Sequence, residues 1–132
     1  MAQVKTWSKE ELGQKGDSLE NSSPQDVLRW AIKEFSPDIS LACSFGMEDV
    51  VLVDMVSRID PKAKIFYLNT DLLFPETYEV RDQLAQKYGL SFVEVRPTLS
   101  LQEQAAQYGE ALWSRDPNLC CDLRKVKPWR DY

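Results

Sequence analysis

Three short apolar runs, each bounded by turn residues, constrain the fold of this 132-residue chain more than any other feature. Each run has the length of a buried strand, and helical spacing of apolar residues separates one run from the next. The runs are Ile39–Phe45, Lys64–Leu68 and Leu90–Val95. Strands that alternate with helices pair in parallel, because each helix carries the chain back across the sheet. The sequence therefore predicts an α/β fold, with a parallel sheet and flanking helices.

The helices expected around these runs begin and end at ordinary signals. Ser23 resembles an N-cap with Pro24 at the first helical position, and Gly89 lies where the helix that begins at Pro75 should end. The expected helices cover residues 24–35, about 50–58, 75–88 and 99–108.

The two ends of the chain carry weaker signals. A short helix could begin at Ser8, Gly13–Ser22 is interpreted as a linker, and the stretch after Tyr108 is expected to be irregular up to a cysteine pair. We expect one domain over residues 1–132, made of a polar N-terminal segment (1–22) and a core (23–132).

Composition excludes several classes of protein. The formal net charge of −5 argues against a general nucleic-acid or membrane-surface binder. We find no segment of membrane-spanning length and no signal-peptide core at the N-terminus. Three cysteines are too few for a secreted disulfide scaffold, so we expect a cytoplasmic protein with reduced thiols.

Basic residues are concentrated near the C-terminus despite the acidic total. They are Arg115, Arg124, Lys125, Lys127 and Arg130. This concentration fits either a local anion site or a solvated basic tail, and the pattern alone does not choose between them.

A polar loop follows the first predicted strand. Ser44 offers a hydroxyl donor, Gly46 lets the backbone approach a ligand closely, and the next helix presents free amides to an anion. Glu48 and Asp49 also have a purely structural interpretation, because acids in a first turn complement the helix dipole.

A second polar loop, residues 69–74, follows the second predicted strand and contains Thr70, which could donate to a phosphate or ribose. Because parallel strands end at the same edge of a sheet, two such loops indicate a nucleotide cleft.

Two adjacent cysteines, Cys120 and Cys121, precede two cations, Arg124 and Lys125. Adjacent cysteines rarely bond to each other, because the bridge strains the peptide between them. Thiols beside cations are typical of metal or cluster ligands. The chain has no histidine, and Cys43 in the first strand is interpreted as a buried core residue. The site is therefore either incomplete in these residues or serves a simpler role.

Three sequence segments occur in a characteristic order. They read Ser44-Phe45-Gly46-x-Glu48-Asp49, Phe74-Pro75-Glu76-Thr77-Tyr78 and Cys120-Cys121-x-x-Arg124-Lys125-Val126-x-Pro128. Together they resemble the assimilatory adenylyl-sulfate and phosphoadenylyl-sulfate reductases over about residues 24–130. The cysteine motif is most similar to the bacterial adenylyl-sulfate branch, whose members carry a four-iron cluster.

The resemblance implies an adenine-nucleotide alpha-hydrolase fold of the pyrophosphatase-loop type. It also implies that adenylyl sulfate is bound by both loops and one arginine, namely Ser44, Phe45, Gly46, Glu48, Asp49, Thr70 and Arg124. Cys120 and Cys121 would be two of the four ligands of a 4Fe-4S cluster. Lys125 would be catalytic, lying between cluster and sulfate and stabilising both anions.

The implied reaction is the reduction of adenylyl sulfate to sulfite and AMP, in sulfate assimilation and cysteine biosynthesis. A reduced cysteine attacks the substrate sulfur, and thioredoxin then releases sulfite. The chain departs from the family pattern because it lacks the second cluster pair, Cys-x-x-Cys, and the nucleophilic tail cysteine. We therefore expect a C-terminally incomplete domain that is inactive alone. In addition, Asn69-Thr70-Asp71 stands where Asp-Thr-Gly is usual, and Trp129 stands where leucine is usual.

Two other classes stay open. An ATP-pyrophosphatase-type domain that binds or transfers adenylate would share the first loop but leaves the cysteine pair unexplained. A bare α/β interaction domain explains neither loop. Iron content separates the three classes, and the oligomeric state, a homo-oligomer included, is not decided by the sequence.

Overall fold

The computed structural model describes residues 5–132. Its helices are α1 (Lys9–Leu19), α2 (Pro24–Phe35), α3 (Met47–Ile59), α4 (Pro75–Tyr88), α5 (Leu101–Tyr108), α6 (Leu112–Arg115), α7 (Pro117–Cys121), the π-helical turn η1 (Asp122–Val126) and α8 (Lys127–Asp131). Its strands are β1 (Ser40–Ala42), β2 (Lys64–Leu68) and β3 (Val93–Val95). No helix of this described part is long and apolar enough to cross a membrane.

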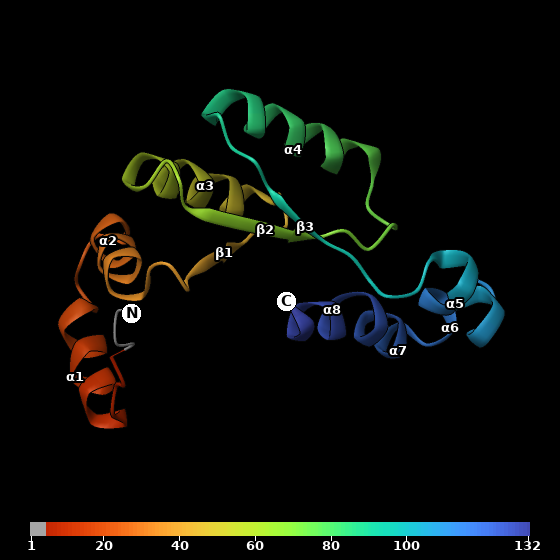
Figure 1. Ribbon diagram of the computed structural model, residues 1–132, viewed down its shortest axis with the longest axis horizontal. Coiled ribbons are helices and arrows are strands. Elements are labelled where there is room, and N and C mark those ends of the chain that lie inside the picture. The colour runs from red at the N-terminus through yellow and green to blue at the C-terminus, as the bar shows by residue number, and fades with distance from the viewer. Residues whose placement is uncertain (1–4) are drawn as a thin grey trace.

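The three strands form one parallel sheet in the order β1-β2-β3. In its register Leu41 pairs with Ile65, and Phe66 pairs with Val93. Figure 1 shows α3 and α4 together on one side of the sheet and α8 on the other. The predicted fold class, a parallel sheet with flanking helices, is confirmed.

The main core lies between the sheet and the helices α3 and α4. Val53 of α3 and Ile65 of β2 are fully buried, and they belong to one apolar cluster with Leu84 of α4. Phe66 packs separately, with its ring 4.7 Å from the ring of Tyr132 at the end of α8. A strand buried on both faces has a continuous apolar sequence, which is why the pattern predicts β2 over its full length.

The outer strands are shorter than predicted. Cys43 still donates its amide to the Phe66 carbonyl at 2.9 Å, but Phe45 has a φ of 65° and so leaves the extended conformation. Gly89 has a φ of 64° and ends α4, as predicted. Leu90 then donates its amide to the α4 carbonyl of Ala85 at 3.0 Å, so β3 begins only later, at Val93.

The predicted linker Gly13–Ser22 is wrong, because α1 continues through Gly13 and Gly16 to Leu19. Ser8 and Glu11 form a reciprocal capping box that satisfies the first amides of this helix. No residue of α1 is buried. The helix is anchored instead by Trp7 just before it, whose ring lies edge-on to Trp30 of α2 at 6.0 Å.

The segment after Tyr108 is helical rather than irregular, which corrects a second prediction. Asp116 caps α7 through its carboxylate, and Pro117 takes the first helical position. In η1 the amide of Lys127 donates to the carbonyl of Asp122, five residues earlier. This wide turn holds one residue more than an α-helical turn. Helical pieces this short show too little apolar periodicity to be predicted.

Candidate functional site

A cavity of about 290 Å³ lies at the carboxyl ends of β1 and β2. Its lining comprises Ala42, Cys43, Ser44, Phe45, Asp49, Phe66, Tyr67, Leu68, Thr70, Leu73 and Lys125. The structure therefore brings together five of the predicted site residues, which come from both loops and from η1. Gly46, Glu48, Arg124, Cys120 and Cys121 do not line this cavity.

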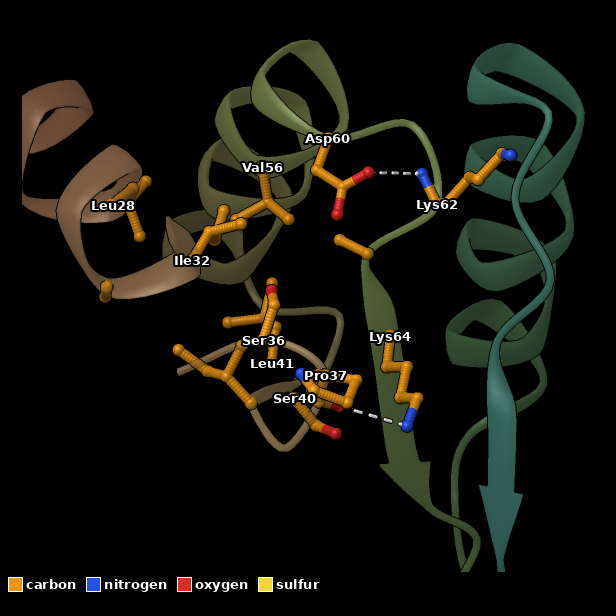
Figure 2. A pocket seen from close by; sticks show the side chains of 13 residues that line it. Leu28, Ile32, Ser36, Pro37, Ser40, Leu41, Val56, Asp60, Lys62 and Lys64 are labelled. Atoms are coloured by element: carbon orange, nitrogen blue, oxygen red, sulfur yellow. Dashed lines mark hydrogen bonds between the residues drawn. The ribbon is translucent and has the colours of Figure 1, made fainter. Parts of the chain in front are cut away.

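A second cavity, of about 240 Å³, lies near the amino ends of β1 and β2 (Figure 2). Its walls are mainly apolar and include Leu28, Ile32 and Val56. Lys64 at its edge donates to the Pro37 carbonyl at 3.1 Å. None of the predicted site residues lines it, so we assign the candidate site to the cavity at the carboxyl edge.

The first loop is held by a carboxylate of α3. Asp49 accepts hydrogen bonds from both the amide and the hydroxyl of Ser44, each at 2.6 Å. Phe45, which lies between Ser44 and Asp49 in the sequence, adopts the left-handed conformation, which costs a non-glycine residue roughly 1–2 kcal/mol. Gly46 has an ordinary φ of −69° and room for a Cβ, so the backbone itself does not demand glycine there. No side chain of the described residues caps α3, which leaves its first amides open to an anion.

The second loop is packed into the protein. Asn69 and Thr70 are both buried. The side-chain oxygen Oδ1 of Asn69 accepts from the Tyr78 hydroxyl at 2.7 Å and from the Asp71 backbone amide at 3.0 Å. The Thr70 hydroxyl oxygen accepts the Leu72 amide at 3.2 Å, which leaves the hydroxyl proton available to a ligand at the cavity.

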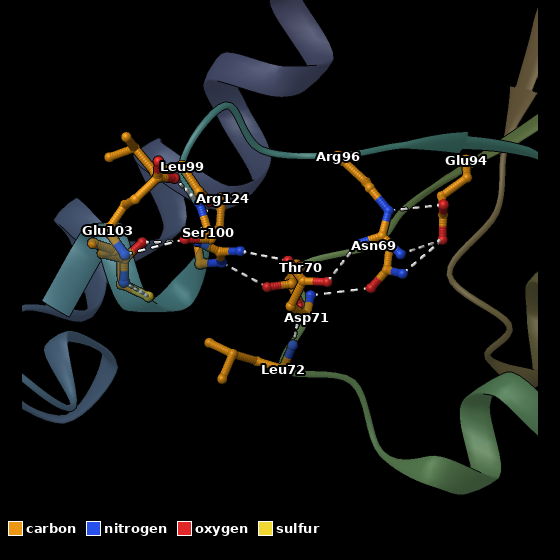
Figure 3. Close-up of polar contacts among 12 residues, drawn as sticks. Asn69, Thr70, Asp71, Leu72, Glu94, Arg96, Leu99, Ser100, Glu103 and Arg124 are labelled. Carbon is orange, nitrogen blue, oxygen red and sulfur yellow. Dashed lines mark hydrogen bonds and ion pairs between the residues drawn. The ribbon is translucent and has the colours of Figure 1, made fainter.

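A charged network supports this loop from β3 (Figure 3). Glu94 accepts from Arg96 at 2.8 Å, from Asn69 at 2.7 Å and from Tyr67 at 2.8 Å. These bonds, that of Arg96 first, lower the pKa of Glu94 to about 2. Burial, followed by the bond to Glu94, raises the pKa of Tyr67. Sequence reasoning missed this network, because its members lie too far apart in the chain to form a local motif.

Arg124, a predicted substrate contact, lies in the interior with 1% of its surface exposed. Its guanidinium donates to the Thr70 carbonyl, to the Leu99 carbonyl at 3.1 Å, to Gln104 Oε1 at 3.0 Å and to Asp71 Oδ2 at 2.9 Å. Four of its five N–H donors are thus engaged by the protein. No local pattern in the sequence indicates Gln104 or Asp71 as its partners.

Lys125, the next residue, is exposed and lines the cavity. The neighbouring side chains therefore have different surroundings, one inside the protein and one at the candidate site.

The two cysteines of the pair also differ in exposure. Cys120 is buried, with its sulfur 3.9 Å from the Gln104 amide nitrogen, whereas Cys121 is exposed. Cys43 belongs to the core cluster, as predicted, and burial raises the pKa of its thiol. Within residues 5–132 no three Cys, His, Asp or Glu side chains lie together as a metal-binding group.

Together these features define a class of protein. A parallel α/β sheet with two polar loops and a cavity beyond its carboxyl edge is the arrangement of α/β domains that bind ligands at that edge.

Comparison with known proteins identifies the family within this class. Residues 38–132 match the family model of the phosphoadenosine phosphosulfate reductase domain, and the chain belongs to that family. It is 46% identical over 126 residues to an adenosine 5'-phosphosulfate reductase of Geobacillus kaustophilus, covering 95% of this chain and 54% of that protein. It is 44% identical over 132 residues to the enzyme of that name from Geobacillus sp. (strain WCH70), covering 99% of this chain and 56% of that protein.

A solved structure gives the same result for the fold. The phosphate complex of phosphoadenylyl-sulfate reductase from Candida auris superposes with a TM-score of 0.84 at 30% identity. The match covers 96% of this chain and 63% of that one. The predicted family and the adenine-nucleotide alpha-hydrolase type of fold are thereby confirmed. The chain spans about half the length of the relatives it matches.

Proposed function

We propose that this chain forms the nucleotide-binding part of an enzyme that reduces adenylyl sulfate to sulfite and AMP in sulfate assimilation. The observation that carries the proposal is that Ser44, Thr70 and Lys125 line the same cavity, in a chain of this family. Because the relatives named adenosine 5'-phosphosulfate reductase are longer, the activity is proposed for a protein of their length.

The chemistry of the cavity suits a phosphosulfate, which carries negative charge on both of its groups. The open amides of α3 and the hydroxyls of Ser44 and Thr70 can donate to its oxygens, and Lys125 adds a mobile positive charge. Asp49 is occupied by Ser44, so we assign it the structural role of shaping the loop. Arg124 acts from behind the Thr70 loop, without touching the substrate.

The proposed reaction has three displacements at sulfur. A cysteine thiolate outside these residues attacks the sulfur of adenylyl sulfate, an S–S bond forms, and the S–O bond to the phosphate breaks to release AMP. One thiol of a dithiol donor, for which we propose thioredoxin, then attacks the cysteine sulfur and releases sulfite. The second thiol of the donor displaces the cysteine from the mixed disulfide, which restores the cysteine thiolate and leaves the donor as a disulfide. Lys125 would stabilise the charge that develops on the departing phosphate oxygen. The proposed compartment is the cytoplasm, where thiols stay reduced.

The cysteine pair fits half of a cluster site. A 4Fe-4S cluster takes four thiolates, and Cys120 and Cys121 are thiols of the right chemistry for two of them. The described residues complete no such site by themselves. In a longer protein these two residues would hold the cluster, which would supply a compact charged centre near Lys125.

Calorimetric titration of a protein of the relatives' length tests the proposal. We expect adenylyl sulfate to bind and ATP to bind far more weakly, because the cavity offers one lysine and no further cation for a triphosphate within residues 5–132. The substitution Lys125→Ala should weaken adenylyl sulfate binding. Tight ATP binding with none for adenylyl sulfate would instead support the pyrophosphatase-type alternative.

A further inference from the structure

The aspartate in the second loop links three separate parts of the chain. One oxygen of Asp71 accepts from Arg96 beyond β3 at 2.8 Å, and the other accepts from Arg124 in η1 at 2.9 Å (Figure 3). Asp71 is itself in the left-handed conformation, with a φ of 61°. Aspartate tolerates this conformation better than most residues, but glycine adopts it at no cost. Aspartate at this position therefore makes two contacts with arginine that glycine, the unstrained residue, could not make.

Arg124 connects this carboxylate to the wall of the cavity. Its Nε donates to the carbonyl of Thr70, whose side chain lines the cavity. Successive residues of a helix project about 100° apart, and this spacing is only moderately altered in a wide turn. With Arg124 fixed inward, the direction of Lys125 is fixed as well, and Lys125 lines the same cavity.

We infer that Asp71 is a positioning residue, whose carboxylate locks Arg124 and so holds the segment from Cys120 to Lys125 against the second loop. The placement of Lys125 toward a substrate sulfate rests on the proposed function. The locking of the segment does not, since it follows from the contacts of Asp71 and Arg124 alone.

The three cysteines of the chain provide the test. Cys43, directly after β1, and Cys120 in α7 are equally buried, each 5% exposed, and Cys121 is exposed. In the iron-free chain under reducing conditions, iodoacetamide should label Cys121 fast and the other two slowly. Local release of the segment accelerates Cys120 alone, whereas global unfolding accelerates Cys43 equally.

The decisive variant is Asp71→Asn, which keeps the shape and removes the charge. We expect the labelling rate of Cys120 to rise at least about tenfold while that of Cys43 stays unchanged. Asp71→Gly, which also relieves the left-handed strain, should give the same result. The matched control is Asp54→Asn, because Asp54 is similarly exposed and binds Arg58 at 2.9 Å and Tyr88 at 2.7 Å. This control should leave Cys120 slow.

An unchanged Cys120 rate in both Asp71 variants overturns the inference. An equal rise in the labelling rates of Cys43 and Cys120 also overturns it, because the contact between Asp71 and Arg124 would then serve global stability only. A second measurement reports on the substrate: in a protein of the relatives' length, Asp71→Asn should weaken adenylyl sulfate about tenfold and leave AMP unchanged. If the unsubstituted protein does not bind adenylyl sulfate, the proposed function fails, and the labelling result still decides the role of Asp71.

Discussion

Asp49, in the first turn of α3, accepts hydrogen bonds from both the backbone amide and the hydroxyl of Ser44, each at 2.6 Å. The acid therefore does more than complement the dipole of its own helix. It closes a short ring of contacts around Phe45, whose left-handed conformation it helps to maintain. The shape of the first loop depends on this one carboxylate.

Removing that carboxylate should loosen the loop. We expect Asp49→Ala to lower the free energy of unfolding by about 1–2 kcal/mol, since two charge-assisted bonds at a partly exposed site are lost. Urea denaturation measures the change. Glu48→Ala, which alters the exposed neighbouring acid, is the control and should stay within about 0.5 kcal/mol of the unsubstituted chain.

Lys125→Ala should reduce turnover by about a hundredfold to a thousandfold in a protein of the relatives' length, because one electrostatic donor to the reacting group is lost. The folded state should be little affected, since the side chain is exposed. Sulfite release, iron content and thermal midpoint are measured together. Lys127→Ala is the matched control, an exposed lysine that pairs with Asp131 at 3.0 Å and does not line the cavity. Near-normal turnover of Lys125→Ala with its iron intact would refute the role assigned to this lysine.

Arg124→Ala should behave differently from its neighbour. Because the guanidinium is buried and bound to Asp71, truncation leaves one oxygen of that carboxylate and several carbonyl groups without this partner, although Arg96 still binds the other oxygen. The expected loss is about 3–5 kcal/mol in the free energy of unfolding. Chemical denaturation monitored by circular dichroism measures it. A loss below about 1 kcal/mol would show that the interior contacts of Arg124 contribute little.

Acid should weaken the fold partly through Glu94. Its pKa of about 2 in the folded state lies below the value of about 4.3 in the unfolded state. The ionised carboxylate therefore stabilises the fold fully at pH values above the unfolded pKa. This contribution is lost as the pH falls from about 5 toward 2. In Glu94→Gln the loss of unfolding free energy between about pH 6 and pH 3 should be smaller than in the unsubstituted chain. Glu79→Gln, on the exposed face of α4, is the control variant and should lose as much unfolding free energy over this pH range as the unsubstituted chain.

Two glycines should respond to alanine in opposite ways, although a Cβ at either would meet open space. Gly13 lies inside α1, so Gly13→Ala should stabilise the chain by about 0.5–1 kcal/mol. Gly89 has a φ of 64°, so Gly89→Ala should destabilise it by about 1–2 kcal/mol. Thermal denaturation of both variants compares the two effects. Equal signs would contradict the backbone conformations described for α1 and for the end of α4.

The sequence predicted those features that depend on neighbouring residues. The continuous apolar run of β2, the start of α2 at Pro24 and its end before Pro37, and the loop from Ser44 are all local patterns. It indicated a helix start at Ser8 but not the extent of α1, because Gly13 and Gly16 weigh against a helix that its capping box and the anchoring of Trp7 nevertheless maintain.

Contacts between distant residues could not be predicted in this way. Arg124 binds Asp71 across 53 positions and Gln104 across 20, and no local periodicity reports such a pairing. Arg124 was therefore expected at the substrate, as the basic residue of a recognised motif, and its burial became evident only from the fold. Lys125 does line the cavity, but the family resemblance rather than a local pattern placed it beside the substrate, and its role there stays a prediction.

Position along η1, and not side-chain chemistry alone, decides which of the two cations faces the cavity. Deleting one residue from Asp122–Val126 would convert the turn to ordinary α-helical spacing and rotate everything beyond the deletion by about 100° relative to the cysteines. A deletion before Arg124 would move Lys125 into the position of the buried arginine and Arg124 into that of Leu123, without any change in either side chain. We therefore expect insertions and deletions in this turn to disturb the candidate site more than substitutions at its exposed positions do.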